Sequence, residues 1–547
     1  MPRSERRWVL LVVLAVVVLS NLPYLVAWAV APPGTYFGGL VFSPPDGYSY
    51  LAKLRQGYNG SWRFHLPYTP EPHAGGYLYL YHLALGHLAR LLHLPLVLVY
   101  HAARLAGGAA MLVALYGLAR RVARAAAPRS EGFATASGAG LVGEPRVMFL
   151  LAALGAGLGW LVVALGVTTA DLWVPEAFPV YALLTNAHFP LAIALMIAIA
   201  RCGLELLAGD GRDGTAWGIG MLGASVLLGV VQPFGLLTVF GGLAVAMALR
   251  WGRQRRVAAS AWGWSVAAGV LALPYPIYMQ LAIHSDPVLS AWSAQNTTPS
   301  PAPWDWALSF GVILALAVPG LWFALRRGSD GDWLLAGWAL VTLVGMYLPL
   351  PLQRRLSLGL GVPLGLLAGM GWWRVLRPRV KPRRRGFVGA LLVASSALTP
   401  LFLVLMSAVG ASAGEPWYYI RAGERAALEW LRTQGNPEAV VLCAPQTGVL
   451  VPALAGQRVV YGHPFETVNA EARRAQVEAF WAGRMTPDEQ AAFLRENRVG
   501  YVLAGPREEA LSGGRINALG ELGPPVFRAA DVRIYALPLA AEGAAAK

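Results

Sequence analysis

Residues 8–30 read WVLLVVLAVVVLSNLPYLVAWAV, an apolar run that follows the basic residues Arg3, Arg6 and Arg7. A helix of about 20 apolar residues crosses the roughly 30 Å hydrocarbon core of a bilayer. This run is longer than the core of a signal peptide, and no clear small-residue cleavage site follows it. The sequence therefore predicts that it is retained as a first membrane span.

Similar apolar runs recur along the chain as far as Val409, with short charged gaps between them. Of the 547 residues, 56% are hydrophobic and only 13% are charged, against about 25% charged in soluble proteins. The pattern predicts a polytopic α-helical membrane protein in which residues 1–409 form the transmembrane domain. The predicted spans number about eleven and cover 8–30, 96–119, 147–167, 188–207, 216–232, 234–250, 257–280, 306–325, 333–350, 356–373 and 387–409.

The basic residues are sorted between alternate gaps. If the N-terminus is cytoplasmic, the inner gaps hold Arg120, Arg121, Arg124, Arg129, Arg146, Arg201, Arg212, Arg250, Arg253, Arg255, Arg256, Arg326, Arg327 and the run 374–385. The outer connections hold Lys53, Arg55, Arg63, Arg90, Arg354 and Arg355. This positive-inside pattern predicts a multi-pass plasma-membrane protein. It also explains the net charge of +15 without nucleic acid as a partner. Residues 77–94 are interpreted as an amphipathic helix at the outer surface rather than a further span.

Three outer loops are long, covering 31–95, 168–187 and 281–305. After the last span the sequence becomes globular in pattern over residues 410–547. Helices are expected at 424–434 and 486–497, and strands at 439–443, 499–504 and 532–537. Strands that alternate with helices predict a small α/β domain, and the charge sorting places it on the extracytoplasmic side.

The first outer loop begins with Phe42-Ser-Pro-Pro-Asp46-Gly-Tyr-Ser-Tyr50. A carboxylate at a membrane–water boundary is suited to act as a general base, and Tyr50 is a candidate substrate contact. The alternative is structural, because Pro-Pro-Asp-Gly is typical of a turn in which Asp46 bonds its own backbone. With its acid early in the first outer loop, its amphipathic helix and its C-terminal outer domain, the chain resembles the GT-C glycosyltransferases. Many of these have two neighbouring acids at this position, where this chain has Asp46 alone.

The second outer loop contains Asp171, Glu176 and His188. Asp171 and Glu176 are candidate catalytic residues that orient the acceptor or an ion, and His188 is a candidate substrate contact. Oxygen ligands from Asp46 and Asp171 suit a divalent cation such as Mg²⁺ or Mn²⁺. The alternative is that both loop acids are ordinary solvated residues near a helix N-terminus, where negative charge is favourable.

Arg354 and Arg355 break the charge sorting at the outer end of a predicted span. Guanidinium groups match phosphate oxygens bidentately, which predicts a phosphate site; the alternative is snorkelling toward lipid headgroups.

Arg104 lies inside a predicted span, where a charged residue is by default a functional candidate. It either reaches the phosphate or pairs structurally with an acid such as Asp46. In the C-terminal domain, His463 within Tyr461-Gly-His-Pro is interpreted as a structural loop residue; the alternative is that this turn faces the active site.

The resemblance implies an inverting transferase with a polyprenyl-phosphate sugar donor and a glycan, lipid or protein acceptor. Asp46 would deprotonate the acceptor, and Arg354, Arg355 and Arg104 would bind the donor phosphate. The rival interpretation is a transporter or lipid flippase. That class favours acids and broken helices near the middle of the membrane, often in repeated halves, and the sequence shows no repeat.

Overall fold

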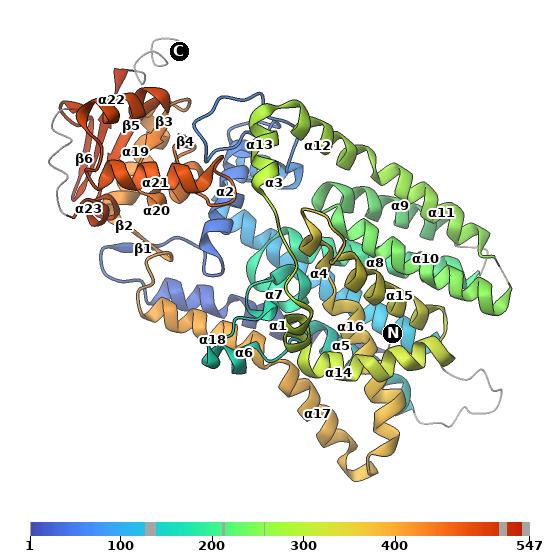
Figure 1. Ribbon diagram of the computed structural model, residues 1–547. Helices are drawn as coiled ribbons and strands as arrows, with labels where there is room; N and C mark the ends of the chain where they lie inside the picture. Colours follow the sequence, from blue (N-terminus) through green and yellow to red (C-terminus); the bar gives the residue numbers. More distant parts are fainter. Residues whose placement is uncertain (1, 126–137, 210–213, 256, 514–521, 539–547) are drawn as a thin grey trace. The chain divides into compact units, whose positions relative to one another are not determined.

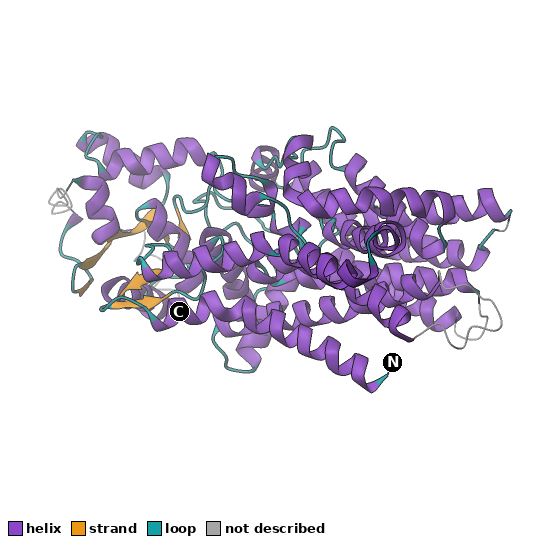
Figure 2. Ribbon diagram, turned by 90° about the horizontal axis from the view of Figure 1, so that it is seen from below, coloured by secondary structure: helices purple, strands orange, loops and turns teal. Residues whose placement is uncertain are grey.

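We analysed a computed structural model that describes residues 2–125, 138–209, 214–255, 257–513 and 522–538. Arg129, Arg212 and Arg256, which the charge sorting used, lie outside these residues. The described chain is mostly helical, and Figure 2 shows its few strands in orange. Nine of its helices are long and apolar enough to cross a membrane, or ten if one bent pair is counted as a span. The chain is therefore a multi-pass membrane protein, as the sequence predicts.

The candidate spans correspond to ten of the eleven predicted ones. They are Arg3–Ala29, Leu96–Arg124, Gly143–Leu165, His188–Ala208, Gly214–Val231, Phe234–Gln254, Ala259–Ser285, Pro303–Arg327, Gln353–Arg379 and the bent pair Pro382–Ser396 with Leu398–Ser412. The pair bends by 43°. The helices behind them are α1 (Arg3–Ala29), α4 (Leu96–Ala125), α5 (Gly138–Leu154), α6 (Gly159–Val162), α8 (His188–Ala208), α9 (Gly214–Val231), α10 (Phe234–Gln254), α11 (Ala259–Ala272), α12 (Pro274–Ser285), α14 (Pro303–Arg327), α16 (Gly361–Met370), η5 (Gly371–Leu376), η6 (Arg377–Arg379), η7 (Pro382–Arg384), α17 (Arg385–Ser396) and α18 (Leu398–Ser412).

The helix found at the span predicted over 333–350 is shorter than that span. Helix α15 (Asp330–Gly345) has only 16 residues, which at 1.5 Å per residue is about 24 Å and shorter than the hydrocarbon core. It begins with a capping box between Ser329 and Asp332. The apolar stretch after Gly345 contains Pro349 and Pro351, which lack the N–H that a helix interior requires.

The chain separates into two compact units. Unit 1 comprises Met1–Leu22, Ala102–Ile277 and Thr298–Met406, and unit 2 comprises Pro23–His101, Tyr278–Thr297 and Ser407–Lys547. Unit 2 thus contains the whole predicted C-terminal domain and the whole first outer loop, 31–95.

Helix α16 forms the centre of unit 1, and its span is 94% buried. It packs against α5, α14 and α15. A Cβ at Gly365 would lie 2.2 Å from the Cα of Ala152, and one at Gly369 would lie 2.4 Å from the Cα of Met148. Only glycine permits so close an approach between helices, the usual device of membrane interfaces. The shorter elements of unit 1 are η1 (Val163–Leu165), η2 (Ala170–Leu172), η3 (Pro175–Ala177), α7 (Pro179–Thr185) and η4 (Gln353–Ser357).

In unit 2 the first loop folds into two helices that pack together, α2 (Pro44–Tyr58) and α3 (Leu80–Leu91). At 12 residues α3 is too short to span a bilayer, as the surface interpretation of residues 77–94 requires. Strand β1 (Thr35–Phe37) pairs antiparallel with β2 (Tyr419–Arg421). Helix α13 (Pro287–Gln295) begins at the N-cap Asp286, whose side chain accepts from the N–H groups of Val288 and Leu289.

The C-terminal domain, orange to red in Figure 1, contains a five-stranded mixed sheet. Its strand order is β4-β3-β5-β7-β6. Its strands are β3 (Val440–Leu442), β4 (Arg458–Val459), β5 (Val499–Ala504), β6 (Phe527–Ala529) and β7 (Val532–Ala536). The central three strands, β3, β5 and β7, are those predicted. The helices of the domain are α19 (Ala422–Gln434), α20 (Pro445–Leu454), α21 (Ala470–Trp481), α22 (Pro487–Glu496) and α23 (Pro506–Ser512). The predicted α/β architecture is confirmed.

Candidate functional site

Asp46 lies in the first turn of helix α2. Pro44 starts the helix, a position where proline is favoured because its missing N–H has no intrahelical partner. Negative charge in this turn is stabilised by the helix dipole, and Oγ of Ser43 donates to Oδ2 of Asp46 at 2.6 Å. The alternative prediction, that Pro-Pro-Asp-Gly forms a turn, is therefore wrong, since the motif begins a helix. The Asp46 side chain remains 48% exposed, so a carboxylate oxygen is accessible to a substrate.

The residues that follow Asp46 at helical spacing share its face of α2. Ser49, Tyr50 and Lys53 lie three, four and seven positions further on. Nζ of Lys53 donates to Oγ of Ser49 at 2.6 Å and to Oε1 of Glu466 at 2.7 Å. Ser49 in turn donates to Glu466. The ammonium is fully buried and lies 4.6 Å from the centre of the Tyr79 ring, a cation–π arrangement that further stabilises the charge.

Glu466 is buried beside this lysine. Burial on its own would raise the pKa of the carboxyl group, but the charge of Lys53 and the hydrogen bonds from Lys53 and Ser49 outweigh it and lower the pKa. Glu466 is therefore ionised at neutral pH. Its second oxygen, Oε2, has no hydrogen-bond partner among the described residues.

His463 contacts Asp46. Its Nε2 lies 3.3 Å from Oδ1 of Asp46, and its side chain is 3% exposed. The N–H of Phe465 donates to Nδ1 of the same ring at 3.2 Å. The sequence reasoning assigned His463 a structural role in its loop and did not foresee this contact, because the two residues are far apart in the chain.

Two aromatic groups flank this face of α2. The Tyr50 ring stacks on the imidazole of His82, with 4.9 Å between ring centres and 11° between planes. Tyr68 is fully buried, and its ring centre is 5.7 Å from that of His463. Burial, and then the negative charges of Glu466 and Asp46, raise the pKa of Tyr68 well above its usual value. The Tyr68 side chain is therefore uncharged and lies beside His463.

In unit 1, Asp171 is held by the backbone. Its Oδ2 accepts from the N–H groups of Gly157 and Gly159 at 3.2 and 3.1 Å, and its Oδ1 accepts from Thr169 Oγ1 at 2.6 Å. The side chain is buried, which raises the pKa, while these hydrogen bonds and one from Thr399 oppose the rise. With both oxygens engaged, Asp171 is suited to fixing the loop between α5 and α7.

The Gly155–Gly159 run makes this arrangement possible. Helix α5 ends at Leu154, and α6 begins only at Gly159. A Cβ at Gly157 would lie 1.9 Å from the carbonyl oxygen of Leu308, and one at Gly159 would lie 2.5 Å from Oδ1 of Asp171. The span predicted to be continuous over 147–167 is therefore broken here, where N–H groups released from the helix bind a carboxylate.

Glu176 and Arg354, predicted separately, lie together in unit 1. Nε of Arg354 is 3.6 Å from Oε1 of Glu176, and its guanidinium lies 4.8 Å from the centre of the Trp173 ring. The adjacent Arg355 is partly exposed. No hydrogen bond or ion pair joins its side chain to another residue in the described ranges. Arg355 is thus the more available of the two cations for an external anion.

Arg104 is fully buried in α4. Its Nη1 donates to the carbonyl oxygen of Leu183 at 2.7 Å, and its Nη2 donates to Oδ1 of Asn21 at 2.9 Å. These contacts tie α4 to α7 and α1, as expected of a structural role. His188, at the first residue of α8, is 5% exposed and lies against Phe189.

The predicted divalent-cation site finds little support in the donor atoms. Among the described residues, no three His, Cys, Asp or Glu side chains come close enough together to hold a metal ion. Both oxygens of Asp171 are already engaged by donors.

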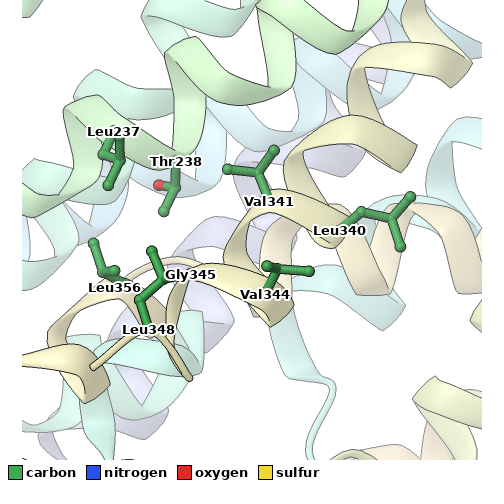
Figure 3. Close-up of a pocket in the computed structure, with 8 residues that line it drawn as sticks. All are labelled: Leu237, Thr238, Leu340, Val341, Val344, Gly345, Leu348 and Leu356. Carbon is green, nitrogen blue, oxygen red and sulfur yellow. The ribbon is translucent and has the colours of Figure 1, made fainter. Parts of the chain in front are cut away.

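An apolar cavity of about 330 Å³ opens in unit 1 between α10 and α15. Figure 3 shows Leu237 and Thr238 on α10 beside Val341 on α15, with Leu348 and Leu356 below them in this view. The remaining lining residues are Leu340, Val344 and Gly345. The hydroxyl of Thr238 donates to the carbonyl of Gly235 in its own helix. The cavity therefore offers no free hydrogen-bonding side chain, and it suits a hydrocarbon chain.

No protein-family model matches this sequence, and no curated protein sequence matches it. Solved structures do. ArnT from Cupriavidus metallidurans bound to undecaprenyl phosphate is 13% identical, with a TM-score of 0.55 over 97% of this chain and 98% of its own. The archaeal oligosaccharyltransferase AglB from Archaeoglobus fulgidus, in complex with an inhibitory peptide and a dolichol-phosphate, is 14% identical. Its TM-score is 0.52 over 96% of this chain and 73% of its own.

The arabinofuranosyltransferase AftD from mycobacteria is 17% identical, with a TM-score of 0.52 over 97% of this chain and 40% of its own. All three are GT-C glycosyltransferases. This chain has the GT-C fold. At such low identities the likeness establishes the GT-C fold alone and does not show which reaction this chain carries out.

The residues of this cluster that sequence reasoning missed are Ser49, Lys53 and Glu466, together with the contact between His463 and Asp46. One signal was available, because Asp46, Ser49 and Lys53 recur at the spacing of one helical face. Their partners in residues 461–467 carried no such signal, since nothing local in the sequence links positions more than 400 residues apart.

Proposed function

We propose that this chain transfers a sugar from a polyprenyl-phosphate donor to a hydroxyl or amide group of an acceptor, with inversion at the anomeric carbon. The observation that carries this is Asp46 in a chain of GT-C fold. Its carboxylate is half exposed, fixed by Ser43 on one oxygen and approached by His463 on the other. A held but accessible carboxylate is what a general base requires.

In the proposed reaction Asp46 takes the proton of the acceptor group while the acceptor atom attacks the anomeric carbon. The bond from that carbon to the phosphate oxygen breaks, and the polyprenyl phosphate leaves with the electron pair. A single displacement of this kind inverts the configuration. The resting protonation state of Asp46 returns when the proton passes to solvent.

Arg354 and Arg355 are proposed to bind the donor phosphate and stabilise the negative charge that grows as it departs. Arg355 has no side-chain partner among the described residues, whereas Arg354 is oriented by Glu176 and Trp173. Glu176 is therefore proposed to position an arginine, and Asp171 to fix the loop that carries Glu176. The nearby apolar cavity, to which Leu356 contributes, is proposed to take part of the polyprenyl chain.

The proposed topology places the N-terminus in the cytoplasm and residues 410–547 outside, so that transfer takes place on the outer face. It counts α15 as a crossing, although this 16-residue helix is shorter than the hydrocarbon core. This keeps Arg326 and Arg327 on the same side as the basic run 374–385, as the positive-inside pattern requires. Labelling of a cysteine introduced at exposed Glu496 by an impermeant reagent in intact cells tests it; protection from the reagent until lysis would contradict it.

The decisive experiment uses the purified chain in lipid nanodiscs, with undecaprenyl-phosphate hexoses and pentoses as donors. Asp46→Asn is expected to lower kcat by about 100-fold or more, the usual contribution of a general base. Asp488→Asn, an exposed carboxamide substitution on α22, is the matched control and is expected to be fully active. Full activity of Asp46→Asn would exclude the general-base role. Solute or lipid movement without transfer by the unmodified protein would favour the transporter.

A further inference from the structure

The loop of residues 461–467 in the C-terminal domain meets helix α2 of the first outer loop, and both belong to unit 2. Two contacts join them along one face of α2. His463 approaches Asp46 in the first turn, and Glu466 binds Ser49 and Lys53 one and two turns further on. The position of the proposed base is thus tied to a segment more than 400 residues away.

Hydrogen bonds and close packing hold the loop at His463. Oγ1 of Thr467 accepts from the N–H groups of Gly462 and His463 at 3.3 Å each. Gly462 packs so closely that a Cβ would lie 2.4 Å from the carbonyl oxygen of Gly448. At the other end of the loop, the Lys53–Glu466 ion pair is buried on both sides. The imidazole therefore has a fixed place relative to α2.

The hydrogen bonding of the ring fixes its tautomer. Because Phe465 N–H donates to Nδ1, the neutral ring carries its proton on Nε2. That nitrogen lies 3.3 Å from Oδ1 of Asp46 and has no aligned hydrogen bond with any residue in the described part of the chain. The groups that face the ring are Asp46 on α2, Glu466 in its own loop and the phenol of buried Tyr68.

We propose that His463 is a positioning residue whose Nε2–H orients the Asp46 carboxylate, so that the C-terminal domain sets the geometry of the base. Ser43 holds Oδ2 from the helix N-terminus and His463 holds Oδ1 from the C-terminal domain. Between them they restrict a side chain that would otherwise rotate in solvent. The inference rests on the proposed function of Asp46, and it adds a second segment of the chain to the catalytic apparatus.

The kinetic test compares His463→Ala and His463→Gln in the nanodisc transfer assay with undecaprenyl-phosphate sugars. His463→Ala is expected to lower kcat about tenfold while KM for the donor changes less than about twofold, since ordering of the base and not binding is lost. His463→Gln keeps an N–H donor and is expected to recover most of that loss. His93→Gln, at an exposed loop position, is the control. An unchanged kcat in His463→Ala, or equal loss in both variants, would overturn the role.

A second measurement needs no turnover. Solid-state ¹⁵N spectra of histidine-labelled protein identify His463 by the signals lost in His463→Gln. These are expected to show a protonated Nε2 and an unprotonated Nδ1. In Asp46→Asn the Nε2 signal is expected to shift, whereas in Asp488→Asn it is not. A signal indifferent to Asp46→Asn would refute the contact, even if transfer proceeds. A shifted signal in a protein that transfers no sugar would refute the proposed function while leaving the contact in place.

Discussion

Nζ of Lys53 lies 2.7 Å from Oε1 of Glu466, although the two residues are 413 positions apart. The side chains are 0% and 11% exposed, and Ser49 bridges them. Two charges removed from water stabilise a fold only while each has the other, because an isolated buried charge is strongly unfavourable. The pair therefore makes the packing of α2 against the 461–467 loop specific.

Removal of the lysine alone is expected to destabilise the protein. Lys53→Met leaves Glu466 buried without its cation, which costs about 3–5 kcal/mol in comparable cases. The double variant Lys53→Met/Glu466→Gln removes both charges and is expected to lie closer to the unmodified protein. Thermal unfolding midpoints in nanodiscs measure this. A double variant less stable than Lys53→Met would show that the pair is not the source of the effect.

The same pair predicts a pH dependence of stability. The pKa of Glu466 in the fold is below its usual value, so folding favours the ionised form. Its stabilisation is complete above the unfolded pKa of about 4.3 and is lost as the pH falls through the lower folded pKa. The difference in unfolding midpoint between the unmodified protein and Glu466→Gln is expected to be largest at pH 7 and to shrink below pH 4. A pH-independent difference for Glu466→Gln would contradict the assignment.

The two outer arginines are expected to respond differently to substitution. Arg355→Gln removes a cation with no side-chain partner in the described structure, so donor KM should rise about 10-fold or more, as for the loss of a hydrogen bond to a charged group. The unfolding midpoint should hardly change. Arg354→Gln also leaves Glu176 without its cation, and it should lower both activity and stability. Unaltered donor KM in Arg355→Gln would exclude phosphate binding there.

Filling the apolar cavity tests where the lipid chain binds. Val344→Trp places a large side chain in the cavity between α10 and α15, and it is expected to raise KM for undecaprenyl-phosphate donors several-fold. A donor analogue with a short, water-soluble chain should be affected much less. Val318→Trp, on an exposed part of α14, is the matched control. Equal effects on long-chain and short-chain donors would show that the cavity does not hold the lipid.

The sequence predicted most of the helical architecture because long apolar runs have one stable arrangement in a bilayer. It failed where backbone groups are bound by distant residues. Pro44-Pro45-Asp46-Gly47 starts a helix rather than forming a turn, since the residues that follow pack as α2 against α3 and α20. Residues 155–158 interrupt a predicted span because the carboxylate of Asp171 binds the N–H groups released there.

What the sequence determined by itself is the class of protein, namely a multi-pass helical membrane chain with a small C-terminal α/β domain. Hydropathy and periodicity are local properties, and they are sufficient for that. The candidate chemistry was only partly accessible, since Asp46, Glu176 and Arg354 were identified one by one from residue type and depth in the membrane. Only the tertiary structure decided which groups meet: His463 with Asp46, Glu466 with Lys53, and Glu176 with Arg354. The physical reason is that hydrogen bonds and ion pairs act over a few ångströms, and no local pattern records which distant segments the fold brings within that range.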